Sequence, residues 1–182
     1  VEVEQTSDDP PERIGAWFVA QGVKAIVVAC NTATAIAVQT LRRNFDLPIV
    51  GVEPGLKPAI AVTRSGKVGV LATAATLASK RYADLLERIQ RDAPQIEFIA
   101  RVGVGWVESV ERGDLISNDT ATRVADVVTL LLERGCDTLV LGCTHYPFLA
   151  PAIQRAAPQA KIIDTAPAIA RELSRRISPT SS

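Results

Sequence analysis

The chain has 182 residues, 47% of them hydrophobic, which is enough to bury a sizeable core as one large or two small domains. Its 20 basic and 20 acidic residues cancel, and no cluster of Lys and Arg is interleaved with aromatic residues, which argues against a nucleic-acid partner. The apolar runs are far shorter than the ~20 residues that cross a bilayer, and the acidic N-terminal stretch 1–11 is unlike a signal peptide. We therefore expect a cytoplasmic protein with no membrane partner.

Short apolar runs alternate with amphipathic stretches along the whole chain. The runs lie at 25–29, 48–52, 67–73, 97–102, 138–143 and 161–165 and predict parallel strands that are covered on both faces. Pro10 and Pro11 predict the start of a helix that ends at Gly22, and apolar residues recur at helical spacing over 82–89 and 124–132. This order predicts a doubly wound α/β fold, whose ligands bind beyond the carboxyl ends of the strands.

The sequence contains an internal repeat that ends in a cysteine. The segments GVKAIVVACNT (22–32) and GCDTLVLGCTH (135–145) superimpose without a gap. Each has a glycine that ends a helix, then an apolar strand, and then Cys30 or Cys143. The repeat predicts two related lobes whose cysteines lie at equivalent strand ends and face a shared cleft.

A polar pair follows each of these cysteines: Asn31 and Thr32 in the first repeat, Thr144 and His145 in the second. Such residues favour the first positions of a helix, so we expect both thiols to lie near helix N-termini. The partial positive charge there stabilises a thiolate and can also hold a carboxylate ligand.

Other roles for the three cysteines fit the sequence less well. Cys136 precedes a strand and has no polar neighbour that would make it a site residue, and cysteine is often simply buried, so we interpret Cys136 as structural. Zinc needs three or four ligands, whereas one histidine and two separated cysteines form no recognised ligand spacing, so we predict no metal. A redox disulfide remains open, although the chain lacks a CxxC motif.

Two equivalent thiols fit one chemistry in particular. Inverting a stereocentre by proton exchange requires a base on one face of the carbon and an acid on the other, with the roles exchanged in the reverse direction. A hydrolase would instead use one nucleophilic thiol with a base and an oxyanion hole, and a second cysteine would add nothing.

Four segments carry a family resemblance: VVACNTATA (27–35), VGVEPGLKPA (50–59), VGVLATAATLAS (68–79) and LVLGCTHYPFL (139–149). They resemble the glutamate racemases, cofactor-independent members of the aspartate/glutamate racemase family that supply D-glutamate for cell-wall peptidoglycan. The resemblance implies glutamate as a small-molecule substrate, no cofactor, and two α/β lobes related by pseudo-twofold symmetry. Family members often form dimers, so a homodimer stays open.

The same resemblance implies roles for individual residues. Cys30 and Cys143 would be the proton donor and acceptor. The substrate's carboxylate and ammonium groups would be bound by Asn31, Thr32, Thr144 and His145, with further contacts from Thr73 and Thr76. Glu111 would support the second cysteine together with His145.

The resemblance also implies a division of the chain. Residues 1–53 would form the first lobe, completed by 162–182, and residues 54–161 would form the second. Relatives begin with a strand, an Asp-Ser-Gly turn and a Pro-Tyr-Gly loop that are not found here, so we expect an incomplete first lobe and weak or no racemisation. The segment 102–108 also lacks the Cys-Pro that relatives usually show.

Two alternatives to glutamate racemisation stay open. One is a racemase of aspartate or another acidic amino acid, since the sequence does not reveal the depth of the pocket. The other is a non-catalytic remnant or binding protein that keeps the fold.

Overall fold

The computed structural model describes residues 10–177, which divide into two compact units. One, here called the N-terminal unit, takes in the described residues up to Val52 and from Pro167 on. The other, the central unit, is Glu53–Ala166. Residues 1–9 of the acidic stretch and the end of the expected first lobe, 178–182, lie outside the described residues.

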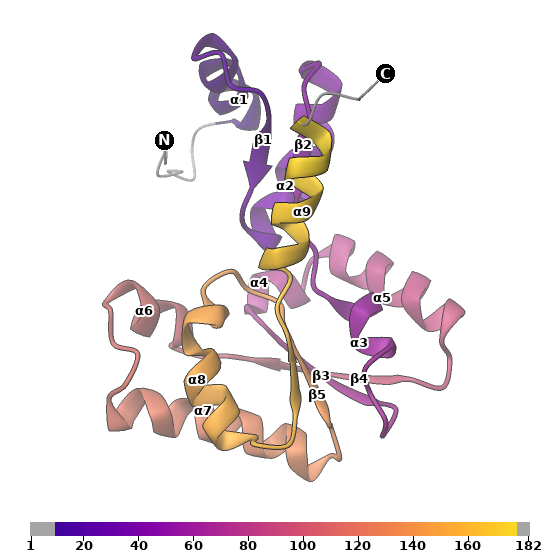
Figure 1. Ribbon diagram of the computed structural model, residues 1–182, viewed down its shortest axis with the longest axis vertical. Coiled ribbons are helices and arrows are strands. Elements are labelled where there is room, and N and C mark those ends of the chain that lie inside the picture. The colour runs from indigo at the N-terminus through magenta and orange to yellow at the C-terminus, as the bar shows by residue number, and fades with distance from the viewer. Residues whose placement is uncertain (1–9, 178–182) are drawn as a thin grey trace. The chain divides into compact units, whose positions relative to one another are not determined.

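The N-terminal unit is built from alternating helices and short strands (Figure 1). In chain order these are α1 (Pro11–Ala20), β1 (Ile26–Val28), α2 (Asn31–Asn44), β2 (Ile49–Gly51) and, from its second residue on, α9 (Ala166–Ile177). The strands β1 and β2 pair in parallel, with Ile26 opposite Ile49. Val38 and Leu41 of α2 pack with these two isoleucines in one buried cluster.

The central unit contains a parallel sheet of four strands in the order β4-β3-β5-β6. These strands are β3 (Lys67–Ala72), β4 (Glu97–Val102), β5 (Thr138–Leu141) and β6 (Lys161–Ile163). The helices are α3 (Leu56–Ile60), α4 (Ala74–Leu77), α5 (Lys80–Asp92), α6 (Trp106–Glu111), α7 (Asn118–Glu133) and α8 (Ala150–Ala156), with a 3₁₀ helix η1 (Tyr146–Leu149) before α8.

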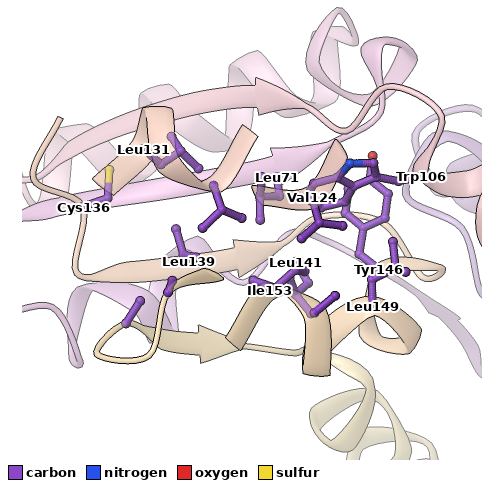
Figure 2. Packing of buried hydrophobic residues seen from close by; sticks show 14 of the residues in the cluster. Leu71, Trp106, Val124, Leu131, Cys136, Leu139, Leu141, Tyr146, Leu149 and Ile153 are labelled. Carbon is purple, nitrogen blue, oxygen red and sulfur yellow. The ribbon is translucent and has the colours of Figure 1, made fainter. Parts of the chain in front are cut away.

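Helices cover both faces of this sheet. Successive side chains of a strand point to opposite sides, so these apolar strands place apolar side chains on both faces. On one face, Leu139 and Leu141 pack with α7 and α8 in the cluster drawn in Figure 2. On the other face, Val68, Val70 and Val140 pack with α3 and α5. The sheet is therefore buried on both sides, as the unalternated apolar runs predict, and the α/β fold class is confirmed.

The predicted elements agree with the observed ones to within a few residues. All six predicted strands are present, and α1 begins at Pro11. The expected division at 161/162 falls inside β6, which pairs with β5, so residues 162 and 163 belong to the central unit. Among residues 10–177, no helix combines the length and the apolar character needed to span a bilayer.

Candidate active site

The sequence repeat corresponds to a repeated backbone structure. Both α1 and α7 end in the same cap, in which a glycine with positive φ donates its N–H to a carbonyl three residues back. Gly22 has φ 71° and donates to Val19, while Gly135 has φ 83° and donates to Leu132. A parallel strand follows each cap and ends just before a cysteine. Cys30 and Cys143 thus occupy equivalent places at the carboxyl ends of β1 and β5.

In the N-terminal unit, Cys30 is the N-cap residue of α2. Its backbone is extended (φ −150°, ψ 130°), its thiol is exposed, and its carbonyl accepts the first helical hydrogen bond, from Thr34 at 2.8 Å. The expectation that Asn31 and Thr32 open a helix is confirmed here. Asn31 is 7% exposed, and its Oδ1 is buried without a hydrogen-bond partner in the part of the chain that the structure describes.

Thr34 fixes the position of the turn that carries Cys30. Its buried hydroxyl donates to the carbonyl of Val28 at 3.1 Å and accepts from the N–H of Val52 at 3.0 Å, so it joins the ends of β1 and β2 to the first turn of α2. This role is not predicted by the sequence, because the contact between Thr34 and Val52 spans 18 positions.

In the central unit, Cys143 follows β5 through Gly142. A Cβ at Gly142 would lie 2.9 Å from the carbonyl oxygen of Leu71, to which the Gly142 N–H donates at 2.7 Å. Only glycine tolerates this close approach between the ends of β3 and β5. The glycine therefore brings the Cys143 turn against the neighbouring strand.

The expectation of a helix that opens at Thr144 and His145 is wrong in detail. These residues form a turn, and the helix that begins at Tyr146 is a short 3₁₀ segment before α8. Pro147 is the physical reason: it has no N–H to donate to the Cys143 carbonyl four residues back, which accepts from the Tyr146 N–H at 3.1 Å instead. Cys143 therefore lacks the long α-helix that begins beside Cys30.

Cys143 has an imidazole beside it instead. Its Sγ lies 3.8 Å from Nδ1 of His145, and Nε2 of His145 lies 3.1 Å from Oε1 of Glu111 at the end of α6. A carboxylate only accepts hydrogen bonds, so Nε2 donates to Glu111 and Nδ1 is left to accept the proton of the thiol. Cys143 is 9% exposed, whereas the His145 and Glu111 side chains are 34% and 65% exposed. The arrangement can take a proton from Cys143 and pass it toward solvent.

Packed aromatic rings lie next to this turn (Figure 2). The rings of Trp106 and Tyr146 meet edge to face at 4.9 Å, and the Tyr146 hydroxyl donates to the carbonyl of Gly103 at 3.4 Å. Burial, and to a smaller extent the charge of a Cys143 thiolate, raises the pKa of Tyr146, so its hydroxyl stays protonated. A Cβ at Gly103 would lie 2.6 Å from the Trp106 ring, which explains the glycine there.

Thr73 and Thr76 lie at the same edge of the central sheet as Cys143, because β3 and β5 are parallel neighbours. Thr73 is the N-cap of α4: its Oγ1 accepts from the N–H of Thr76 at 3.2 Å and lies 3.0 Å from Thr76 Oγ1. Thr73 is half-buried and Thr76 is buried. The two hydroxyls hold the loop in shape.

Cys136 lies at the opposite end of β5 from Cys143. It is 3% exposed, and burial raises the pKa of its thiol to about 11, which keeps it protonated and unreactive. Its surroundings are those of a structural cysteine. Within residues 10–177, no three His, Cys, Asp or Glu side chains are grouped so that they could hold a metal ion.

The fold and these residues define a class of protein: a parallel α/β protein with thiols at equivalent strand ends, one of them paired with a proton acceptor. Comparison with known proteins identifies the family. The Asp/Glu/Hydantoin racemase family matches residues 4–173, and the chain belongs to it.

Several similar proteins are glutamate racemases. That of Methylococcus capsulatus is 52% identical over 165 residues, which are 90% of this chain and 60% of the relative. That of Pseudomonas aeruginosa is 47% identical over 169 residues, 92% of this chain and 63% of the relative. The structure of Escherichia coli glutamate racemase with L-glutamate and the activator UDP-MurNAc-Ala matches with a TM-score of 0.80 and 31% identity, covering 96% of this chain and 67% of that one. The chain thus spans about 60% of the length of the curated relatives.

Proposed function

We propose that the protein racemises glutamate by proton transfer at two cysteines and without a cofactor. The observation that carries the proposal is the line of side chains from Cys143 through His145 to Glu111, with contacts of 3.8 Å and 3.1 Å. It gives one of the two repeated cysteines a proton acceptor, as a thiol that alternates between acid and base requires.

In the proposed reaction, the thiolate of one cysteine takes the proton from the α-carbon, and the C–H electron pair remains on the carbon. The thiol of the other cysteine then gives its proton to the opposite face, which forms the new C–H bond and leaves a thiolate. The reverse direction exchanges the two roles. His145 would accept the Cys143 proton when that cysteine must act as the base, and Glu111 would stabilise the imidazolium. Cys30 would have its thiolate stabilised by the N-terminus of α2.

The substrate assignment is supported by the relatives and by one unpaired polar atom. The Escherichia coli enzyme is described with L-glutamate, and that of Francisella tularensis, 25% identical to this chain, with D-glutamate. In this chain Asn31 Oδ1 is a buried acceptor without a partner among the described residues, which suits a substrate ammonium group. We propose that Thr32, Thr73, Thr76 and Thr144 complete the substrate contacts.

The test measures hydrogen exchange at the α-carbon. The purified protein is incubated with L-glutamate, and separately with L-aspartate, in D2O, and NMR follows the loss of the α-proton while circular dichroism follows the optical signal. We expect both signals to change with glutamate and to fall by at least ~10²-fold in Cys30→Ser and Cys143→Ser. Cys136→Ala is the matched control and should exchange like the wild type.

Other outcomes decide between the alternatives. Faster exchange with aspartate would replace the substrate assignment and leave the mechanism in place. Binding of glutamate without exchange would favour a binding protein. Full racemisation by Cys143→Ser would contradict the two-base mechanism.

A cellular role follows from the proposed product. D-glutamate made by the protein would serve peptidoglycan synthesis, and hence cell-wall formation and cell shape. All three cysteines are free thiols in the structure, which suits the reducing cytoplasm in which we propose that the protein works.

A further inference from the structure

A cluster of hydrogen-bonded side chains lies between α6 and α7, outside the residues assigned to the site so far. The carboxylate of Asp114 is at its centre. Ser117 Oγ donates to Oδ2 of Asp114 at 2.8 Å, the Ser117 N–H donates to Oδ1 at 3.2 Å, and Thr120 Oγ1 lies 2.9 Å from Oδ2. Thr120 Oγ1 also lies 3.2 Å from Oγ of Ser109, and both residues are 1% exposed. The cluster therefore links a buried point on α6 to the first turn of α7.

Asp114 also completes the C-terminal cap of α6. Gly113 has φ 71° and donates its N–H to the carbonyl of Val110 at 2.9 Å, and the Asp114 N–H donates to the carbonyl of Ser109 at 2.8 Å. This is the same cap that ends α1 and α7. Glu111 is the last residue of α6, just before the cap. The backbone that carries Glu111 is thus bonded directly to Asp114.

The length of α6 makes this cap important. The helix has six residues, and a helix of that length is not stable by itself, so neighbouring structure must fix its end. Trp106 anchors the start of α6 against Tyr146 of η1. The end of α6 is held by α7, which has 16 residues and is itself buried in the main cluster of the central unit. The position of Glu111 depends on how firmly the end of α6 is held to α7.

We infer that Asp114 is a positioning residue: its carboxylate holds the end of α6 to α7 and so keeps Glu111 within hydrogen-bond distance of His145. This inference rests on the proposed function, in which His145 accepts the proton of Cys143. The side chains of Glu111 and His145 are 65% and 34% exposed, so water competes for both groups when the helix end moves. Without the Asp114 carboxylate, His145 loses its fixed partner and Cys143 forms a thiolate less readily.

The experiment measures how fast Cys143 reacts with iodoacetamide at pH 7, and peptide mass spectrometry gives the rate for each cysteine. Cys30 of the N-terminal unit, in the same molecule, is the internal reference. Two variants weaken the cluster: Asp114→Ala removes the carboxylate, and Thr120→Val removes a hydroxyl but keeps the buried volume. Glu111→Gln is the reference variant, because it removes the carboxylate partner of His145 directly. Asp119→Ala is the matched control, because Asp119 lies on α7 and pairs with Arg123 on an exposed surface at 2.8 Å.

We expect Asp114→Ala and Glu111→Gln to slow Cys143 by about three- to tenfold relative to Cys30, with a smaller effect for Thr120→Val and none for Asp119→Ala. A merely structural role predicts the opposite sign, since a loosened turn exposes Cys143 and speeds its reaction. His145 is the only histidine of the chain, so its ring ¹⁵N signals are assigned without ambiguity. Asp114→Ala should change the ¹⁵N chemical shifts of the His145 ring in the same direction as Glu111→Gln does.

Three results would overturn the inference: wild-type rates and ring signals in Asp114→Ala, faster reaction of Cys143 in that variant, or an equal effect of Asp119→Ala. The reaction with iodoacetamide requires no turnover of substrate. A protein that fails to racemise glutamate but shows the expected rates would therefore contradict the proposed function and still support the positioning role of Asp114.

Discussion

Cys143 and His145 are two residues apart in the chain, and their side chains meet across the turn after β5, with Sγ 3.8 Å from Nδ1. In an extended strand, residues i and i+2 project from the same face about 6.6 Å apart, which is farther than this contact. The turn after Gly142 converts this sequence spacing into a thiol–imidazole contact. Glu111 then fixes the ring from the other side at 3.1 Å.

Replacing His145 by Gln should remove the proton acceptor and leave the fold intact, since the His145 side chain is 34% exposed. We expect the turnover number for racemisation to fall by about 10²-fold, with a smaller change in KM, because the interaction serves proton transfer rather than binding. Steady-state kinetics in both directions check this. An unchanged turnover number would exclude His145 from the reaction.

Replacing Cys136 by Ala should lower the free energy of unfolding by about 1 kcal/mol through loss of buried volume and leave racemisation unchanged. Urea denaturation and the exchange assay measure the two effects. A large loss of turnover in a stably folded Cys136→Ala protein would show that the structural interpretation of this thiol is wrong.

Thr34→Val should destabilise the N-terminal unit by about 1–3 kcal/mol. The buried hydroxyl bonds to both Val28 and Val52, and valine of the same shape leaves that carbonyl and N–H unpaired. Thr34→Ser, which keeps the hydroxyl, should lose less. Urea denaturation should give Thr34→Ser the higher free energy of unfolding of the two variants. Equal values would argue that the hydrogen bonds of the hydroxyl are not the cause of the lost stability.

Asp137 should make stability depend on pH in the acidic range. Burial alone would raise its pKa, but hydrogen bonds from the hydroxyls of Thr63 and Thr138 and from the N–H groups of Arg64 and Ser65 outweigh it, so its folded pKa lies below the ordinary value of about 3.9. A lowered pKa stabilises the folded state at every pH above about 4, and this stabilisation is lost as the pH falls through the folded value.

The test for Asp137 compares the wild type with Asp137→Asn by urea denaturation. The variant should be less stable by about 1–3 kcal/mol at pH 7, and the difference should shrink below pH ~4 because Asp137 of the unfolded wild-type chain takes up a proton there while the folded carboxylate does not. A difference that stays constant from pH 7 to pH 3 would mean that the charge of Asp137 plays no part.

Gly142→Ala should disturb the Cys143 turn. The added Cβ would lie 2.9 Å from the Leu71 carbonyl oxygen, and backbone cannot move aside as a side-chain tip can. We expect the free energy of unfolding to fall by about 1–3 kcal/mol, and the turnover number to fall more than in Gly69→Ala. Gly69→Ala is the control, because its Cβ would meet the ends of the Leu131 and Leu139 side chains, away from the turn. Equal turnover in the two variants would contradict the role given to Gly142.

Local patterns in the sequence predict the strands, the α/β class, the repeat and the place of Cys30 and Cys143 at strand ends. These features are local: apolar runs, capping glycines and prolines act over a few residues and leave a pattern in the chain. The equivalence of the two cysteines also follows, because two similar segments fold to the same helix cap and strand.

The surroundings of each cysteine depend on contacts between segments that are distant in the sequence. Glu111 meets His145 across 34 positions, and its role could be expected only from the family resemblance. Thr34 contacts Val52 across 18 positions, and Asp137 contacts Thr63 across 74, and neither pairing has a signal in the sequence. Such contacts depend on which strands are neighbours and on where each turn ends, and hydrophobic periodicity does not report either. The helix expected at Thr144 begins at Tyr146 for a local reason, since Pro147 has no N–H to donate to the Cys143 carbonyl.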